Sequence, residues 1–448
     1  MIENMKNEEI NSVTSFAVTN YRDIRKIFGI KEKNRRGHMY VIGKTGAGKS
    51  TLIKTMVISD ILDGNGVALI DPHGDLVQDI LDFISENRIN DVVYFNPADL
   101  EYPIALNPLE SVPADFRGLI VSGLISVFKK IWGEFWGPRL EHILRHALLT
   151  LMEYPGSTLL DLPRLLTDKD FRASILQKIT SQQLKQFWFF EFDKYSVWLR
   201  SQAISPILNK IGQFVTSPLL SHIVGQKKNI FHFRKLMDEG KILIANLAKG
   251  KIGEDNCSLL GSMIVTEIQL AALSRVDIPE NQRRSCYLYV DEVHSFLTLA
   301  FADILSAARK YGLSLVLAHQ YIEQLDKEIR SAIFGNVGTI IAFRVGAEDA
   351  EYLAREFYPI FEESDLINLP NHHIYLKLMI DGVTSKPFSA VTLMPKEPDK
   401  SYKEQVIEAS RKHYARKRED VEKEITLRYY SAPFQKLLPS KTSQPSMF

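Results

Sequence analysis

The sequence predicts an α/β protein in which a largely parallel central sheet is covered by helices and interrupted by an inserted all-α domain. Short apolar runs alternate with helical segments, as in the strand–helix–strand units of a parallel sheet. Residues 114–236 show helical periodicity, hardly any strand-like runs, and all four tryptophans of the chain. A glycine-rich turn at residues 43–51 joins an apolar run to a helix. We therefore expect a lead-in (1–36), an α/β domain in two pieces (37–113 and 237–395), an inserted all-α domain (114–236), and a charged helix with a loose tail (396–448).

The composition excludes several classes of protein. The chain has 448 residues, 45% of them hydrophobic and 24% charged, which is typical of a globular protein with two or three domains. Its net charge of +1 creates no overall basic field, so any nucleic acid must be held by a few loops or by a ring of subunits. Cys257 and Cys286 have no neighbouring ligand at metal spacing, which argues against zinc. We find no signal peptide and no apolar run of roughly 20 residues, and therefore expect a cytoplasmic protein without a transmembrane segment.

The lead-in is expected to contribute little regular structure. The residues up to Arg22 mix Asn, Glu and Ser, a composition that predicts an irregular segment. A basic cluster follows, formed by Lys31, Lys33, Arg35 and Arg36. We interpret this cluster as a solvated turn; the alternative is that it lies near the ligand of the glycine-rich turn.

The glycine-rich turn matches G-x-x-x-x-G-K-[ST], the pattern of a phosphate-binding loop. Its glycines let backbone N–H groups point at phosphate oxygens, and the helix that follows adds its N-terminal donors. Lys49 would reach the β- and γ-phosphates, and the Ser50 hydroxyl would ligate Mg²⁺. The predicted nucleotide-binding residues are Gly43, Lys44, Thr45, Gly46, Ala47, Gly48, Lys49, Ser50 and Thr51. A flexible loop that happens to carry a lysine is the alternative, but the flanking strand and helix favour an ATP site.

Two buried strands and the all-α insertion come next. The strands are predicted at 66–71 and 92–96, and the turn Asp71-Pro72-His73-Gly74-Asp75 leads into a helix that Asp75 is placed to cap. Within the insertion, the aromatic run Phe187–Phe192 has two interpretations. It could stack on nucleic-acid bases, or it could form the core of a small helical bundle, and we favour the core.

A basic loop follows the next predicted strand, at 241–247. Lys249 and Lys251 flank a glycine in this loop, at the spacing of a segment that contacts DNA phosphates. An exposed turn would have the same composition, so the sequence leaves both interpretations open.

Two acidic residues complete the hydrolytic motif. Asp291 and Glu292 follow the apolar run 286–290, as in a Walker B strand, where Asp291 would hold Mg²⁺ through water and Glu292 would polarise the attacking water. The alternative is an acidic strand end at a helix cap. The run 313–319 is another buried strand and ends in Gln320, which can sense the γ-phosphate or orient water.

The C-terminal third ends the sheet. A strand is predicted at 339–345, and residues 372–393 predict a hairpin that turns at Asp381-Gly382. The segment 403–426 predicts one charged helix with mixed signs, which favours a solvated or subunit-bridging helix over a DNA contact.

The ordered set of motifs resembles the HerA/FtsK superfamily of P-loop DNA motors, and within it the TraG/TraD-type coupling ATPases of conjugative transfer. The residues that carry this resemblance are the GKTGAGKST loop, the IDPHGDL turn, the helical insertion, and the VDE and LAHQ strand ends. It implies a RecA-like P-loop NTPase core, ATP and Mg²⁺ as cofactors, and a homo-hexameric ring with DNA in its pore. It also implies that the glutamine strand lies between the Walker A and Walker B strands.

The resemblance further implies that an arginine of the neighbouring subunit completes each site. Arg309, between the Walker B strand and Gln320, is the first candidate, and Arg344, at the end of the last parallel strand, is the second; a surface salt bridge is the alternative for both. The insertion corresponds to the domain that faces the relaxosome and the DNA entrance. Many coupling proteins begin with transmembrane helices, and we find no such segment in this sequence. We therefore expect the chain to reach the inner membrane and a secretion channel through partners.

These features favour an ATP-hydrolysing DNA translocase of conjugative transfer or type IV secretion. The alternatives are a HerA-type helicase-translocase in DNA end processing, an ATPase that powers protein secretion, and a nucleotide-gated scaffold. Intact Lys49, Asp291, Glu292 and Gln320 argue against the scaffold, because a pure binder does not need a hydrolytic glutamate.

Overall fold

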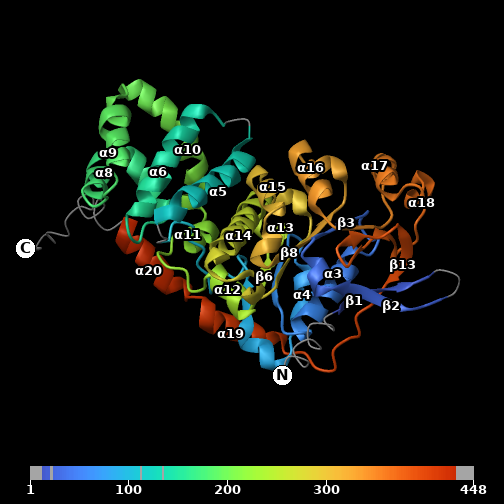
Figure 1. The fold of residues 1–448 in the computed structure, drawn as a ribbon. Helices are drawn as coiled ribbons and strands as arrows, with labels where there is room; N and C mark the ends of the chain where they lie inside the picture. The colour runs from blue at the N-terminus through green and yellow to red at the C-terminus, as the bar shows by residue number, and fades with distance from the viewer. Residues whose placement is uncertain (1–12, 21–23, 111–113, 134–135, 430–448) are drawn as a thin grey trace, which may run out of the picture.

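A mixed sheet and a helical domain lie side by side in the computed structural model (Figure 1), which describes residues 13–20, 24–110, 114–133 and 136–429. The strands are β1 (Val13–Thr19), β2 (Ile27–Lys31), β3 (Met39–Ile42), β4 (Gly66–Asp71), β5 (Val92–Phe95), β6 (Ile242–Asn246), β7 (Cys286–Val290), β8 (Leu313–His319), β9 (Thr339–Ala342), β10 (His373–Lys377) and β13 (Phe388–Thr392). Within the described residues they form one 11-stranded sheet in the order β2-β1-β13-β10-β9-β3-β8-β7-β4-β6-β5. The strands from β9 to β5 are parallel, as predicted, and those from β2 to β10 form an antiparallel edge.

The strand order places the predicted site at one edge of the sheet. β8 lies between β3 and β7, with Ile42 paired to His319 and Val290 to Leu317. Because parallel strands present their carboxyl ends at the same edge, the turn after β3, the acids after β7 and the glutamine after β8 converge there. The glutamine strand therefore lies between the two Walker strands, as the resemblance implied.

Helices cover both faces of the sheet and bury alternate side chains of each strand. Met39 and Val41 of β3 pack in a cluster with α3 (Lys49–Leu62), α4 (Asp75–Leu81) and α19 (Lys403–Tyr414). Tyr40 and Ile42 pack in the opposite cluster, with α14 (Glu254–Ser274) and the helical domain. Continuous burial on two faces explains why the central strands are uniformly apolar in sequence.

The segment between β5 and β6 is helical wherever regular structure is described. Its α-helices are α5 (Ala114–Trp132), α6 (Pro138–Glu153), α7 (Leu162–Thr167), α8 (Lys169–Leu176), α9 (Gln182–Gln186), α10 (Val197–Thr216), α11 (Pro218–Val224) and α12 (Phe233–Glu239). In the aromatic run, Phe187, Trp188 and Phe192 are buried, while Phe189 and Phe190 are 48% and 73% exposed. The core interpretation therefore holds for Phe187, Trp188 and Phe192, and it fails for Phe189 and Phe190.

The remaining helices and the hairpin follow the Walker strands. They are α13 (Lys249–Ile252), α15 (Leu299–Leu305), α16 (Lys327–Asn336), α17 (Ala347–Phe357), α18 (Glu363–Ile367) and the pair β11 (Met379–Ile380) and β12 (Val383–Thr384). The hairpin turns at Asp381-Gly382, as predicted, and both residues have positive φ.

The predicted single charged helix is two helices, α19 and α20 (Arg418–Tyr429), which lie along one side of the molecule in Figure 1. α19 packs on β5 and α20 on α11, so the pair connects the sheet to the helical domain within one chain. Arg428 Nη2 donates to the buried Asp161 carboxylate at 2.5 Å. The break at 415–417 allows this path, and no proline or glycine marks it in the sequence.

One helical stretch, Glu254–Asp277, is long and apolar enough to cross a membrane among the residues that the structure describes. Its mean hydropathy is 1.4, and 67% of the apolar window is buried within the protein. Packing against the sheet and α5 accounts for this apolar character.

Where the structure describes it, from residue 13 on, the lead-in contradicts the expectation of an irregular segment; residues 1–12 lie outside the described part of the chain. The expectation of a solvated basic turn holds for the exposed Lys31 and Lys33 and is wrong for Arg35. Residues 13–19 form β1, which pairs with β13 and β2. Arg35 is buried, and its guanidinium binds the Asp60 carboxylate, with 2.9 Å between Nη2 and Oδ2. Tyr289 Oη donates to the same carboxylate at 2.6 Å. Both partners are distant in sequence, so local composition could not predict this burial.

Replacing Asp60 with Ala should therefore destabilise the fold by about 3–5 kcal/mol, because it leaves a buried guanidinium without its counter-ion. The Asp60 and Arg35 side chains are 0% and 1% exposed. The matched control is Lys31→Ala at the exposed Lys31–Asp381 pair, where a loss of at most about 1 kcal/mol is expected. Urea unfolding of both variants measures the difference; equal losses would contradict a structural role for the buried pair.

Candidate active site

The loop after β3 has the backbone of a phosphate cradle. Gly48 has φ of 121° and is the N-cap of α3, so the first turn of that helix points its free N–H groups into the loop. A Cβ on Gly48 would lie 2.9 Å from His372 Nδ1, and a Cβ on Gly43 would lie 2.5 Å from Phe343 Cβ. Both glycines are therefore required by space as well as by the predicted motif.

A cavity of about 200 Å³ lies over this loop. Its lining residues are Thr45, Gly46, Gly48, Lys49, Ser50, Thr51, His73, Asp291, Glu292, Gln320 and His372. The structure thus brings together the predicted phosphate-binding, metal-binding and hydrolytic residues of three different strand ends. Hydroxyl and carboxylate oxygens are the ligands that Mg²⁺ prefers, so Ser50 and Asp291 fit the predicted metal.

Lys49 extends into the loop, where its ammonium donates to Gly43 O at 2.6 Å and to Lys44 O at 3.3 Å. Burial lowers the pKa of Lys49, and the charges of Asp291 and Glu292 oppose that effect. Burial also raises the pKa of Asp291 to about 6, with the neighbouring charges of Glu292 and Asp71 adding to the shift. This crowding of carboxylates beside a phosphate cradle favours a bound divalent cation.

Gln320 connects the loop to Glu292, the predicted catalytic glutamate. Thr45 Oγ1 donates to Gln320 Oε1 at 2.9 Å, and Gln320 Nε2 donates to Glu292 Oε1. Glu292 follows β7 with φ of 49°, a left-handed conformation that is uncommon for a residue with a Cβ. The amide therefore holds the glutamate carboxylate beside the phosphate loop, where it can act on a water molecule.

The turn after β4 positions His73, a residue whose role the sequence did not indicate. Asp71 accepts hydrogen bonds from His73 N at 2.8 Å and Val77 N at 3.1 Å, so its side chain ties down the turn and the start of α4. The expected cap, Asp75, is the first residue of α4, and Gly74 is the N-cap. His73 is consequently held at the wall of the cavity over the phosphate loop.

His372 is a second site residue that sequence reasoning missed. Its backbone N–H donates to Ala47 O at 2.8 Å, and its φ is 66°. It lies on the loop between α18 and β10, far from the glycine-rich turn in sequence. Because a positive φ at a non-glycine residue leaves no mark in the sequence, only the fold reveals this contact.

The two candidate arginines occupy opposite edges of the sheet. Arg344 follows β9 next to the phosphate loop; its carbonyl accepts from Lys44 N at 2.8 Å, and its Nη2 donates to Asn371 Oδ1 at 3.0 Å. Arg309 is exposed and precedes β8, so it lies at the amino end of the strands, away from the cavity of its own chain. A role for Arg309 therefore requires a neighbouring subunit.

Lys249 and Lys251 lie in α13, directly after β6, at the same sheet edge as the site. Both side chains are exposed, and neither forms an ion pair with another residue in the described part of the chain. Lys249 N donates to Pro72 O at 2.9 Å, which fixes the start of α13 against the turn after β4. The DNA contact of these two lysines stays a prediction.

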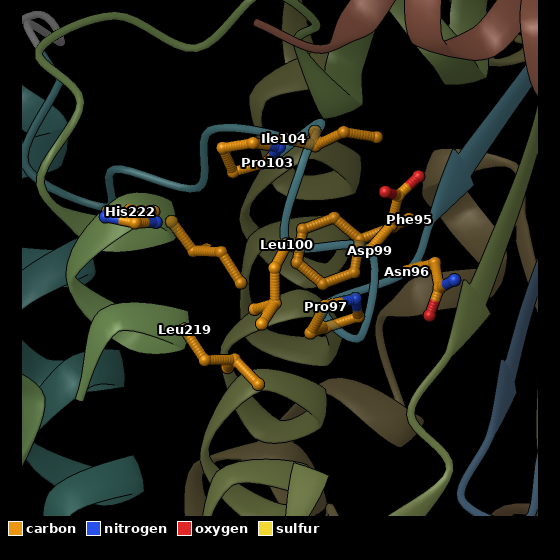
Figure 2. A pocket seen from close by; sticks show the side chains of 10 residues that line it. Phe95, Asn96, Pro97, Asp99, Leu100, Pro103, Ile104, Leu219 and His222 are labelled. Atoms are coloured by element: carbon orange, nitrogen blue, oxygen red, sulfur yellow. The ribbon is translucent and has the colours of Figure 1, made fainter. Parts of the chain in front are cut away.

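A smaller cavity lies where the loop after β5 meets α11, and Figure 2 shows its apolar lining from Phe95, Leu100, Ile104 and Leu219. Its volume is about 10 Å³, room for a single water molecule at most. It is a packing defect between the sheet and the helical domain, and the larger cavity over the phosphate loop is the candidate active site.

Together, the parallel sheet, the phosphate loop and the converging acids define a protein of the RecA-like P-loop NTPase class, with a candidate site for a nucleoside triphosphate and a divalent cation. Residues 23–358 match the model of a family described as the type IV secretion-system coupling protein DNA-binding domain. The chain belongs to this family.

Individual relatives are distant. The type 4 coupling protein DotL of Legionella pneumophila is 21% identical over 374 residues, which cover 69% of this chain and 47% of DotL. The chain thus spans about half the length of that curated relative.

Solved structures share the fold at low sequence identity. The plasmid coupling protein TrwB, in complex with ADP and Mg²⁺, has a TM-score of 0.60 at 16% identity, covering 89% of this chain and 93% of that one. VirB4 of Thermoanaerobacter pseudethanolicus has a TM-score of 0.53 at 15% identity, covering 88% and 99%.

Proposed function

We propose that this protein is an ATP-driven DNA translocase that serves conjugative transfer or type IV secretion. The observation that carries the proposal is the convergence of Lys49, Asp291, Glu292 and Gln320 at one sheet edge, in a member of a family named for a DNA-binding domain. The names of its relatives, a type 4 coupling protein and a conjugative coupling protein, support the same setting.

The proposed reaction is the hydrolysis of ATP to ADP and phosphate. Glu292 accepts a proton from water, whose oxygen attacks the γ-phosphorus as the bond to the bridging oxygen breaks. Lys49 and the N–H groups of the loop stabilise charge on the phosphate oxygens. Gln320 senses the γ-phosphate and contacts the Glu292 carboxylate through its amide. Mg²⁺, held by Ser50 and Asp291, would neutralise the charge of the β- and γ-phosphates.

The proposed assembly is a ring-shaped homo-hexamer with DNA in its pore, and each site is completed by Arg309 of the adjoining subunit or, failing that, by Arg344. A ring provides the basic surface that one subunit of net charge +1 does not. The helical domain would face a relaxase or relaxosome, and the proposed location is the cytoplasm, peripheral to the inner membrane through a secretion channel.

DNA should stimulate ATP hydrolysis, and replacing both Lys249 and Lys251 with Ala should weaken this stimulation without changing ATP affinity. The logarithm of DNA affinity should fall linearly with the logarithm of salt concentration, and each lost phosphate contact should reduce the slope by about one. The measurements are ATPase rates and DNA-binding titrations over a range of salt, with single- and double-stranded DNA.

The matched control replaces Lys412 and Lys423, two exposed lysines of α19 and α20, and should leave the slope unchanged. An unchanged slope in the Lys249/Lys251 variant would return that loop to the solvent-exposed interpretation. An ATPase rate that DNA does not change would contradict the proposal and would favour a protein as the transported substrate.

A further inference from the structure

A lysine of the helical domain is bonded to the loop that follows the catalytic glutamate. Lys130, in the last turn of α5, donates to His294 O at 2.8 Å and to Leu297 O at 2.7 Å. α5 belongs to the insertion, whereas the loop belongs to the ATPase domain directly after Glu292. These two hydrogen bonds therefore join the two domains close to the reacting groups.

The same loop residue also contacts the glutamate. His294 Nδ1 lies 3.5 Å from Glu292 Oε2, so the residue whose carbonyl Lys130 binds has its imidazole against the catalytic carboxylate. On the other side of the loop, Ser258 Oγ of α14 donates to Ser295 O at 2.9 Å. Side chains from α5 and α14 thus bind three backbone carbonyls of this loop, those of His294, Ser295 and Leu297.

The loop needs such support because of the conformation at its start. Glu292 has a left-handed backbone, which persists in a residue with a Cβ only when its surroundings hold it there. Burial lowers the pKa of Lys130 to about 8, against the opposing charge of Asp326, so the ammonium is kept at this place at the expense of its hydration. A lysine that faced solvent would keep its full hydration.

We infer that Lys130 is a positioning residue for ATP hydrolysis: it holds the loop after Glu292 and couples the state of the nucleotide site to the helical domain. When the glutamate and Gln320 adjust to the γ-phosphate, the carbonyls of His294 and Leu297 move with them, and α5 follows through the lysine. The reverse path lets a movement of the helical domain shift Glu292 and so change the hydrolysis rate.

The chain carries its own reporter for this coupling. All four tryptophans lie in the helical domain, and Trp132 is two residues beyond Lys130 in the same helix. Its ring is buried and stacks on Phe128, with 4.7 Å between ring centroids. A non-hydrolysable ATP analogue should therefore change the tryptophan fluorescence of the wild-type protein although it binds in the other domain.

Lys130→Met should lower kcat by about 10- to 100-fold, because a small displacement of a catalytic group has effects of that size. The Kd for the ATP analogue should remain within about twofold, since Lys130 touches no residue of the phosphate loop. The fluorescence response should be lost. Lys130→Arg retains donors and should restore part of kcat, and the control Lys129→Met, at the exposed neighbour, should match the wild type in all three measurements.

A Lys130→Met protein with wild-type kcat, or one that keeps the fluorescence response, would overturn the inference. If this variant does not fold, hydrogen exchange of the wild-type protein decides: binding of the analogue should change amide exchange across residues 126–132. Wild-type protein with no change in either fluorescence or exchange at α5 would also overturn it. The inference rests on the proposed hydrolysis of ATP at Glu292, and a wild-type protein without ATPase activity would contradict that proposal itself. Because these experiments contain no DNA, their outcome is independent of the proposed translocation.

Discussion

Replacing Glu292 with Gln is expected to slow ATP hydrolysis by about 10²- to 10⁴-fold while ATP stays bound, because only the proton acceptor for water is removed. The amide has the size of the carboxylate and can still contact Gln320, so the geometry of the cavity should survive. Lys49→Ala should behave differently: it removes the main side-chain countercharge to the phosphates and should abolish both tight binding and turnover.

Two measurements separate the variants. The Kd for a fluorescent ATP analogue tests binding, and single-turnover hydrolysis tests chemistry. The expected pattern is a retained Kd with lost hydrolysis in Glu292→Gln, and loss of both in Lys49→Ala. Equal loss of binding in the two variants would mean that Glu292 and Asp291 have been assigned the wrong roles.

Arg309→Ala should leave ATP affinity unchanged and lower the hydrolysis rate by about 10²-fold or more. An arginine supplied by a partner is worth about 10³–10⁵ in rate in GTPases, so even a tenth of the smaller effect is measurable. The exposed position of Arg309 at the amino end of β8, away from the cavity of its own chain, means that any such effect must come from an adjoining subunit.

Mixing Arg309→Ala with Glu292→Gln subunits tests this sharing directly. Some mixed interfaces would then combine an intact Glu292 with an intact Arg309, and part of the activity should return. Sites built within one subunit would gain nothing from mixing. If mixed hexamers form without recovery, Arg309 is excluded, and Arg344→Ala in the same mixture is the next test.

The sequence by itself predicted which residues meet at the candidate site. The glycine-rich turn is a local pattern, because its backbone conformation and its lysine and serine all lie within nine consecutive residues. Asp291, Glu292 and Gln320 were predictable because each terminates an apolar run long enough to be a buried strand. Doubly buried strands of a parallel sheet are apolar at nearly every position, and the carboxyl ends of parallel strands must share one edge.

Only the tertiary structure decided which distant residues support that site. β1 pairs with a strand more than 370 residues later in the chain, and Arg35 finds its counter-ion in α3; neither contact has a local pattern. His372 reaches the phosphate loop through a backbone conformation that its residue type does not predict, and Lys130 meets the Glu292 loop across a domain boundary. Such contacts depend on how separate elements pack together, and this packing cannot be predicted from the residues next to each of them in the sequence.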